Sequence, residues 1–232
     1  GSYGYEAVLY ALDLDSPRRR PRRVLQEAFR GFEVLPGGAV LLSRDRADAF
    51  GSEIRVLSAG DTRSRLLAVS ELRAEELLHD GERWLYLSAR REGANSGLYR
   101  AALAASAPLG PGAPSGSAAQ LGRTAPVLAL EQILDTPYAE RDICLEGGLL
   151  LFSANWEGIH GLYVWQAGDG SVSALSAAET FAVDPVLLED RVWFTGLSAS
   201  GYPLRSRPLE PAPAQPPEAV PPPAVLAMAR TR

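Results

Sequence analysis

The sequence is poor in the residues that most often carry chemistry. Its 232 residues include one cysteine, two histidines and no lysine, so that all 23 basic residues are arginines. The lone cysteine, Cys144, excludes an intrachain disulfide. Acidic residues outnumber basic ones by 28 to 23. This balance argues against a nucleic acid partner, because binding to a phosphate backbone relies on a basic excess.

Long hydrophobic runs are missing as well. The longest stretch without a charged residue, 101–122, is interrupted by three prolines and several glycines, so it cannot form a helix that spans a membrane. We therefore expect no membrane span in this segment. With 46% hydrophobic and 22% charged residues, the chain has the composition of a globular protein with a large core.

One pattern occurs four times along the chain. It consists of a turn with Gly or Asp, an apolar run that ends in Ser or Thr, a polar loop and a second apolar run. The residues that close the first run are Ser43, Ser88, Ser153 and Thr195. The residues that open the second run, including a truncated N-terminal copy, are Leu9, Ile54, Leu98, Leu162 and Leu204, spaced 45, 44, 64 and 42 residues apart. A period near this length is typical of one blade of a β-propeller.

Each repeat divides into four short strands, named a to d from the centre of a propeller outward. For the second unit we expect them at 30–35, 39–43, 53–58 and 64–69. The run "RWLYLS" from Arg83 is apolar on both faces, whereas a sheet with one solvated face alternates apolar and polar residues. Stacked blades bury both faces. The pattern therefore favours an all-β propeller of four-stranded antiparallel blades, with a β-sandwich as the alternative.

The repeats also define the expected domain organisation. The propeller covers 1–210, and a proline-rich linker or tail covers 211–232. The expected units are a partial blade at 1–29 and blades at about 30–70, 71–135 with an inserted loop at about 104–124, 136–180 and 181–210. The first unit supplies only strands c and d, and the last supplies a, b and c, so the four to five visible blades do not close a ring cleanly. We expect part of a larger propeller, joined to additional domains of the same parent chain.

Two repeats carry a resemblance to a known family. The stretches "LHDGERWLYLSARREGANSGLYRAAL" from Leu78 and "LFSANWEGIHGLYVWQAGDG" from Leu151 resemble the TolB-like or WD40-like (PD40-type) β-propeller repeat. The resemblance extends over about residues 3–210, although the family's Pro-Asp-Gly turn is incomplete here. It implies a propeller that serves as an interaction module, as a gate over a peptidase domain or as part of an envelope assembly. By resemblance alone, the expected location is the periplasm or cell envelope.

Motifs for catalysis or metal binding are absent from the sequence. It contains no G-x-S-x-G elbow, H-E-x-x-H, cysteine pair or EF-hand spacing. His79 is expected in an a–b turn and His160 in a b–c loop, and these two kinds of turn lie on opposite faces of a propeller. We therefore expect no catalytic residue, metal or cofactor in this chain.

The b–c loops, which share one face of a propeller, offer the first candidate site. Aromatic and amide side chains of this kind anchor protein interfaces. The candidates are Tyr5, Phe50, Asn95, Trp156, His160 and Tyr202. The alternative is that each ring folds back over its own hairpin.

Two carboxylates offer the second candidate site. Asp142 and Asp184 each lie 11 residues before the Ser or Thr that ends an apolar run, which places both near the start of an innermost strand. Two neighbouring blades would then direct a carboxylate pair at the channel mouth, to hold a cation, bind a basic peptide or act as acid and base in a glycosidase-like site. The alternative is that each caps a local turn, for which Asp followed by Pro185 is a common signal.

On balance the sequence favours a non-catalytic propeller module that binds a protein or peptide. Two alternatives remain open. In the first, the chain is the propeller gate of a serine peptidase, or has a glycosidase-like site of its own. In the second, it is a purely structural spacer domain.

Overall fold

The computed structural model describes residues 7–12, 20–103, 125–175, 181–199, 201–214 and 216–217. Tyr5, the expected inserted loop at 104–124 and most of the expected tail lie outside these ranges. Every helix or strand in the described ranges is a β-strand, and no helix there is long and apolar enough to cross a membrane.

Five antiparallel sheets follow one another along the chain. The first holds β1 (Ala7–Ala11) and β2 (Arg22–Glu27). The second holds β3 (Phe32–Val34), β4 (Val40–Asp45), β5 (Ser52–Leu57) and β6 (Arg65–Ser70). The third holds β7 (Arg73–His79), β8 (Trp84–Arg90), β9 (Ser96–Ala102) and β10 (Leu130–Leu134). The fourth holds β11 (Glu140–Glu146), β12 (Leu149–Ala154), β13 (Gly161–Gln166), β14 (Val172–Ala174) and β18 (Ala212–Pro213), and the fifth holds β15 (Ala182–Leu188), β16 (Arg191–Gly196) and β17 (Leu204–Pro208).

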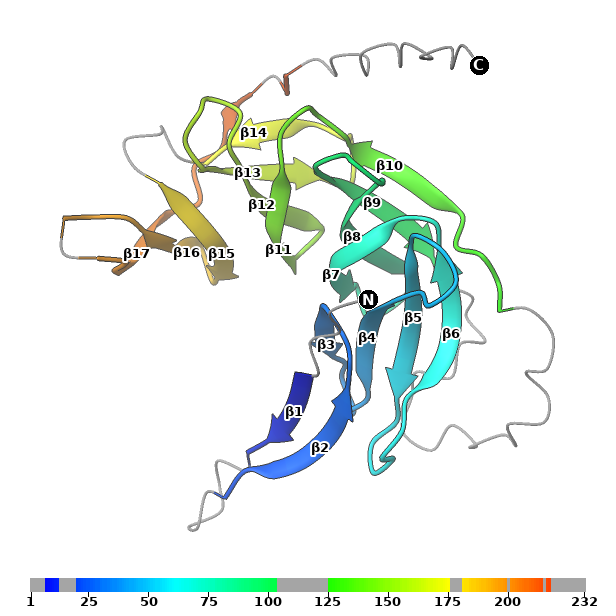
Figure 1. Cartoon of the computed structure of the whole chain (residues 1–232). Coiled ribbons are helices and arrows are strands. Elements are labelled where there is room, and N and C mark those ends of the chain that lie inside the picture. Colours follow the sequence, from blue (N-terminus) through cyan, green and yellow to red (C-terminus); the bar gives the residue numbers. More distant parts are fainter. Residues whose placement is uncertain are drawn as a thin grey trace, which may run out of the picture.

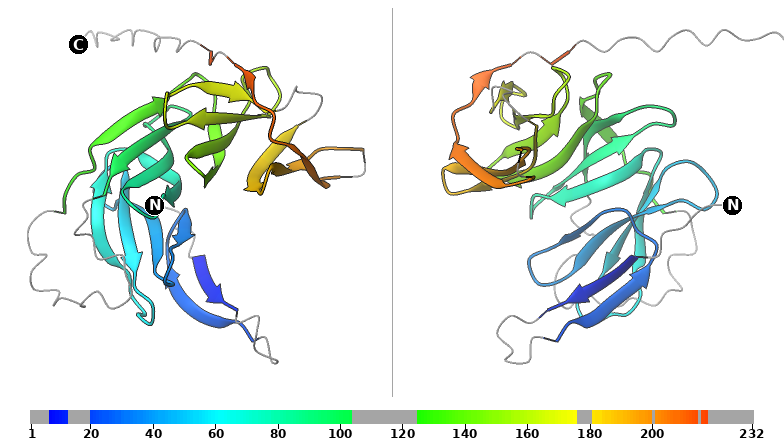
Figure 2. Two further views of the ribbon diagram at one scale, coloured as in Figure 1. Left: turned by 180° about the vertical axis from the view of Figure 1, so that it is seen from behind. Right: turned by 60° about the vertical axis from the view of Figure 1, so that its left-hand side comes forward.

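The sheets stand side by side in an arc, with β3, β7, β11 and β15 on its inner side (Figure 1). Figure 2 shows the same arc from behind and from one side, with the β1–β2 sheet and the β15–β17 sheet at its two ends. The expected fold class, antiparallel blades of a β-propeller, is confirmed.

Neighbouring blades bury apolar side chains from both faces of a sheet, as the doubly apolar run in β8 predicts. Leu85 and Leu87 of β8, at most 1% exposed, belong to one cluster with Ile54 of the preceding blade. Tyr86, between them in sequence, is 3% exposed and packs with Phe152 of the following blade. Alternate residues of one strand thus fill two different interfaces, and this removes both faces of the sheet from water.

The chain leaves the last sheet after three strands. From β17 it crosses to the outer edge of the preceding blade, where β18 pairs with β14 through Ser173 opposite Pro213. Within the described residues, β17 therefore has no strand on its outer side. The start of the expected tail is a short edge strand in the structure.

Candidate functional site

Two aspartates occupy matching irregular positions on the inner strands. The register of β11 against β12 shifts at Asp142, and the register of β15 against β16 shifts at Asp184, so each strand carries a β-bulge. Both aspartates have a φ of 53°. Asp tolerates this left-handed conformation better than most residues, because its short polar side chain forms local hydrogen bonds. Bulges of this kind change the direction of a side chain at a fixed point of a strand.

Each aspartate is fixed by the hydroxyl group 11 residues further along the chain. Ser153 Oγ donates to Asp142 Oδ2, and the hydroxyl of Thr195 forms the corresponding bond to Asp184. On β7, Glu76 accepts from the backbone N–H groups of Asp142, at 3.1 Å, and of Ile143, at 2.9 Å. The spacing seen in the sequence thus has a structural cause, and Glu76 is a third carboxylate that the sequence pattern did not indicate.

A pocket of about 440 Å³ lies between the inner strands. Its walls come from β3, β7, β11 and β15, and they include Glu76, Asp142 and Asp184. Phe32 and Val186, which are 48% and 53% exposed, add apolar surface to the same pocket. Among the described residues, none of these three carboxylates forms an ion pair. The structure therefore places both channel carboxylates named from the sequence in one pocket without a cation opposite them.

The pocket disfavours the negative charge that it carries. Burial raises the pKa of Glu76 above its ordinary value. The pKa of Asp184 is raised first by burial and then by repulsion from Asp142. A cation that enters the pocket would relieve this repulsion. Cys144 also lines the pocket, and burial raises the pKa of its thiol, which keeps the thiol protonated and unreactive.

Trp156 lies in a b–c loop, but its side chain is buried, so the expectation that it anchors a partner there is wrong. Its side chain is 8% exposed, and its ring centroid lies 4.2 Å from that of Tyr163 and 5.7 Å from that of Phe152. The indole Nε1–H donates to Glu140 Oε1 at 2.8 Å. The ring folds back over its own hairpin, because there its large apolar surface is buried and its one N–H has a hydrogen-bond acceptor.

The remaining loop candidates do not form one surface. Asn95 Nδ2 donates to the Pro137 carbonyl oxygen at 2.6 Å, which ties its loop to the next segment of chain. The Phe50 ring is covered by the Arg73 guanidinium, 4.5 Å from the ring centroid. Tyr5 lies outside the described residues.

Of the loop candidates in the described ranges, only His160 and Tyr202 are brought together, through Phe181. The rings of His160 and Phe181 lie 5.0 Å apart between centroids, and those of Phe181 and Tyr202 lie 6.3 Å apart. Tyr202 is 67% exposed. His160 Nδ1 is buried and has no hydrogen-bond partner among the described residues. Phe181 was not indicated by the sequence, because it lies directly before β15 and outside the b–c loops from which the candidates were taken.

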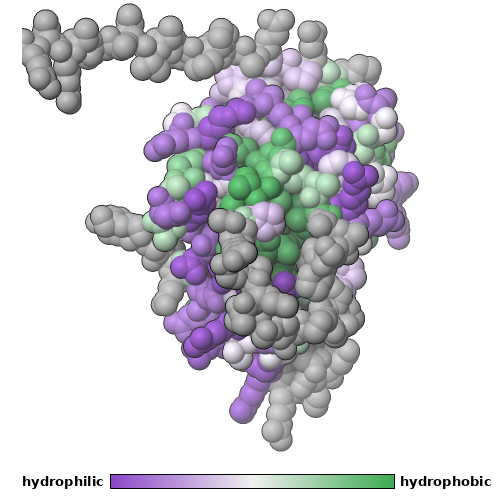
Figure 3. Space-filling model, turned by 90° about the vertical axis from the view of Figure 1, so that its right-hand side faces the viewer, coloured by the Kyte–Doolittle hydropathy of each residue, from purple (hydrophilic) through white to green (hydrophobic). Residues whose placement is uncertain are grey.

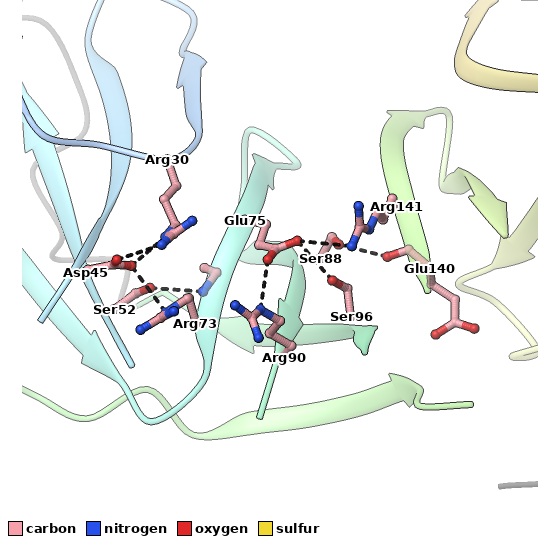
Figure 4. Close-up of polar contacts among 11 residues, drawn as sticks. Arg30, Asp45, Ser52, Arg73, Glu75, Ser88, Arg90, Ser96, Glu140 and Arg141 are labelled. Atoms are coloured by element: carbon pink, nitrogen blue, oxygen red, sulfur yellow. Dashed lines mark hydrogen bonds and ion pairs between the residues drawn. The ribbon is translucent and has the colours of Figure 1, made fainter. Parts of the chain in front are cut away.

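Charged side chains also join strands and neighbouring blades (Figure 4). Arg30 Nε lies 2.6 Å from Asp45 Oδ1, and at the equivalent positions of the next repeat the charges are reversed, with Arg90 Nε 2.9 Å from Glu75 Oε1. Arg73 of the following blade also reaches Asp45, at 3.5 Å. The Arg30–Asp45 pair is more than a third exposed on each side, so we assign it no more than about 1 kcal/mol.

The outer side of the arc also presents apolar surface. Figure 3 shows an apolar area there, with hydrophilic side chains around it. On this side Leu67, Leu128 and Leu130 pack against the core between the second and third sheets. They extend the core to the outer strands. Within the described ranges, no group of three or more His, Cys, Asp and Glu side chains is placed to hold a metal ion.

Glu33 on β3 predicts a pH dependence of stability. Burial raises its pKa to about 7, against the opposing effect of the His79 backbone N–H, which donates to Oε2 at 2.5 Å. A carboxyl whose folded pKa is raised stabilises the fold fully below about pH 4.5 and loses this contribution as the pH rises to about 7. We expect Glu33→Gln to stabilise the protein at pH 8 by about 1 kcal/mol, after allowance for screening by solvent.

The measurement for Glu33 is urea unfolding at pH 4.5 and pH 8. The variant and the wild type should differ clearly at pH 8 and little at pH 4.5. Glu92→Gln, at an exposed turn, is the control and should change stability at neither pH. Equal effects of Glu33→Gln at both pH values would show that the titration of Glu33 does not control stability.

Comparison with known proteins gives similarity in structure alone. No protein-family model matches the chain, and no curated protein matches it in sequence. A TolB structure from Agrobacterium tumefaciens matches with a TM-score of 0.59 and 15% identity, over 82% of this chain and 62% of that one. TolB from Acinetobacter baumannii matches with a TM-score of 0.54 and 14% identity, over 90% of this chain and 49% of that one.

A peptidase also matches. The puromycin-hydrolysing peptidase of Mycobacterium tuberculosis has a TM-score of 0.56 and 15% identity, over 90% of this chain and 34% of that one. The chain thus spans less than two thirds of the length of each of these proteins. At such identities the likeness establishes the fold: the chain is a β-propeller module with the architecture seen in TolB and in the propeller domains of peptidases.

Proposed function

We propose that this chain is a non-catalytic propeller module that binds a protein or peptide, and that the inner-strand pocket takes a cationic group of that partner. One observation carries the proposal. Three carboxylates, Glu76, Asp142 and Asp184, share a pocket of about 440 Å³ and have no ion-pair partner among the described residues. A complementary cation is the ligand feature that such a pocket favours.

The size and lining of the pocket support a side chain as the bound group. Its volume lies within the range of ligand pockets in proteins, about 300–1,000 Å³. Exposed Phe32 and Val186 offer apolar contacts beside the carboxylates. An arginine or lysine side chain combines a charged end with an apolar stem, and therefore matches both parts of the lining.

The likeness in fold to TolB supports a binding role and a cell-envelope location by analogy. The described part of the chain shows no catalytic site. TolB structures are among the structural neighbours, and we extend to this chain the expectation of a cell-envelope location. The same architecture serves several functions, so the pocket, and not the fold, is the part to test.

The test is selection of random heptapeptides on the folded chain, followed by calorimetry with the enriched sequences. We expect the enriched peptides to carry Arg or Lys beside an apolar residue. In the double variant Asp142→Asn and Asp184→Asn, their Kd should rise at least about tenfold, because Asn keeps the left-handed backbone and removes the charge. Asp169→Asn, at an exposed turn between β13 and β14, should leave Kd unchanged.

Two results would contradict this site. One is a set of enriched peptides without basic residues. The other is a basic peptide that binds the double variant as tightly as the wild type, because then the carboxylates do not contact the ligand.

A second candidate function is the gate of a peptidase. The likeness to the mycobacterial peptidase covers 90% of this chain, and it favours this alternative over a spacer. A gate would act within a larger polypeptide that hydrolyses peptides, and the pocket carboxylates would then change kcat/KM for basic substrates. A polypeptide that binds basic peptides without cleaving them supports the binding module instead.

A further inference from the structure

The last sheet of the arc leaves open a face that every interior blade buries. The residue that opens strand c packs against the following blade at Ile54, Leu98 and Leu162, and each of these is 0% exposed. Leu204 has the same repeat position on β17, and it is 69% exposed. The same kind of side chain is thus buried three times and left in solvent once.

Strand b of the last sheet repeats this difference. Leu41, Tyr86 and Leu151 are 0%, 3% and 0% exposed, and each packs against the following blade. Trp193 has their position on β16, and it is only half-buried. Because side chains on one face of a sheet alternate with those on the other, Trp193 and Leu204 lie on the same open face.

The first sheet also has an open face, on the side where the other blades contact their preceding blade. The residue after the strand c anchor is Tyr99 in the third sheet and Tyr163 in the fourth, and both are buried, at 3% and 5% exposed, in clusters shared with the preceding blade. Its equivalent on β1 is Tyr10, which is 57% exposed. Val8, on the same face two residues earlier, is 38% exposed.

The two open faces correspond to the two sides of an interface between neighbouring blades. At the fifth sheet, Trp193 and Leu204 lie where a blade contacts its successor. At the first sheet, Tyr10 and Val8 lie where a blade contacts its predecessor. The strand edges agree with this arrangement, because within the described residues β1 lacks the inner neighbour that β5, β9 and β13 have, and β17 lacks their outer neighbour.

We propose that both faces are blade-to-blade interfaces, and that their occupant is a further antiparallel blade of the same repeat. Continuity with the interior interfaces carries this assignment, since the same repeat positions bury apolar residues at three interfaces in a row. A blade seated on Trp193 and Leu204 would turn toward them the position that Arg55, Tyr99 and Tyr163 hold in the second, third and fourth sheets.

The experiment compares Leu204→Asp in two settings, the 232-residue chain and the polypeptide as its host produces it. In the host polypeptide the substitution places a carboxylate in an apolar interface, and we expect Tm to fall by about 4 °C or more. In the 232-residue chain Leu204 is already in solvent, so Tm should change by less than about 1 °C. Val127→Asp is the control, at a side chain that is 61% exposed and whose backbone pairs with Val69 of the second sheet, and it should change Tm in neither setting.

Two outcomes overturn the proposal. The first is an unchanged Tm of the host polypeptide with Leu204→Asp, which would leave the face without an occupant. The second is a 232-residue chain that sediments at twice its mass of 24.8 kDa and returns to a monomer with Leu204→Asp, which would make a second copy the occupant. Neither outcome depends on binding in the inner-strand pocket, so this proposal and the proposed function can fail separately.

Discussion

Replacement of Trp156 by alanine is expected to lower the free energy of unfolding by about 3–5 kcal/mol. The indole is 8% exposed and packs against Phe152 and Tyr163, so its removal opens a cavity in the core between the third and fourth sheets. It also removes the N–H that donates to the buried carboxylate of Glu140. Urea unfolding followed by circular dichroism measures the loss.

Trp156→Phe separates packing from hydrogen bonding. Phenylalanine keeps most of the apolar contacts and lacks the N–H, so we expect a smaller loss of about 1–3 kcal/mol, because the buried Glu140 carboxylate loses one donor and keeps Thr136. A loss below about 1 kcal/mol for Trp156→Ala would contradict the buried position and return the residue to the loop surface. Equal losses in the two variants would assign the whole effect to the hydrogen bond.

Gly51→Ala should give the second largest effect, a loss of about 2–4 kcal/mol. Gly51 lies just before β5 with a φ of +128°, where an L side chain is strained. A Cβ at this position would lie 2.2 Å from the Ser70 carbonyl oxygen. The obstacle is backbone at the end of β6, which cannot move without breaking the pairing of β5 with β6.

Gly60→Ala is the matched control for this loss. Gly60 also has a positive φ, +91°, but a Cβ there meets no atom within 4 Å. It should therefore show the cost of strain without the cost of the clash, and lose less stability than Gly51→Ala in the same urea titration. Similar losses in the two variants would show that the approach to Ser70 contributes nothing.

The fold could be predicted because the repeat is marked by residues with fixed structural roles. Ser43 and Ser88 lie two residues before the end of strand b in successive blades, and both are 0% exposed. Ser43 Oγ accepts from the backbone N–H of Gly31 at 3.0 Å, and Ser88 Oγ donates to the Glu140 carbonyl oxygen at 2.8 Å. A small hydroxyl residue is required at these points, so the spacing is readable in a single sequence.

The candidate site could be predicted only in part. The spacing of Asp142 and Asp184 from their hydroxyl partners was visible, and the structure places both in one pocket. Glu76 was not visible, because it binds the β11 backbone across a blade interface and has no fixed distance in sequence. Trp156 was misplaced for a related reason: the sequence shows a ring in a loop, but only the position of Glu140 decides which way the ring turns.

Nuclear magnetic resonance mapping of an enriched basic peptide tests the central claim most directly. We predict that the backbone shifts caused by the peptide centre on the pocket residues Phe32, Glu76, Asp142 and Asp184, and that they weaken as salt is added. Shifts centred on Tyr202 and the neighbouring His160 ring would contradict the account. They would place the partner on the loop face and leave the pocket carboxylates without a ligand.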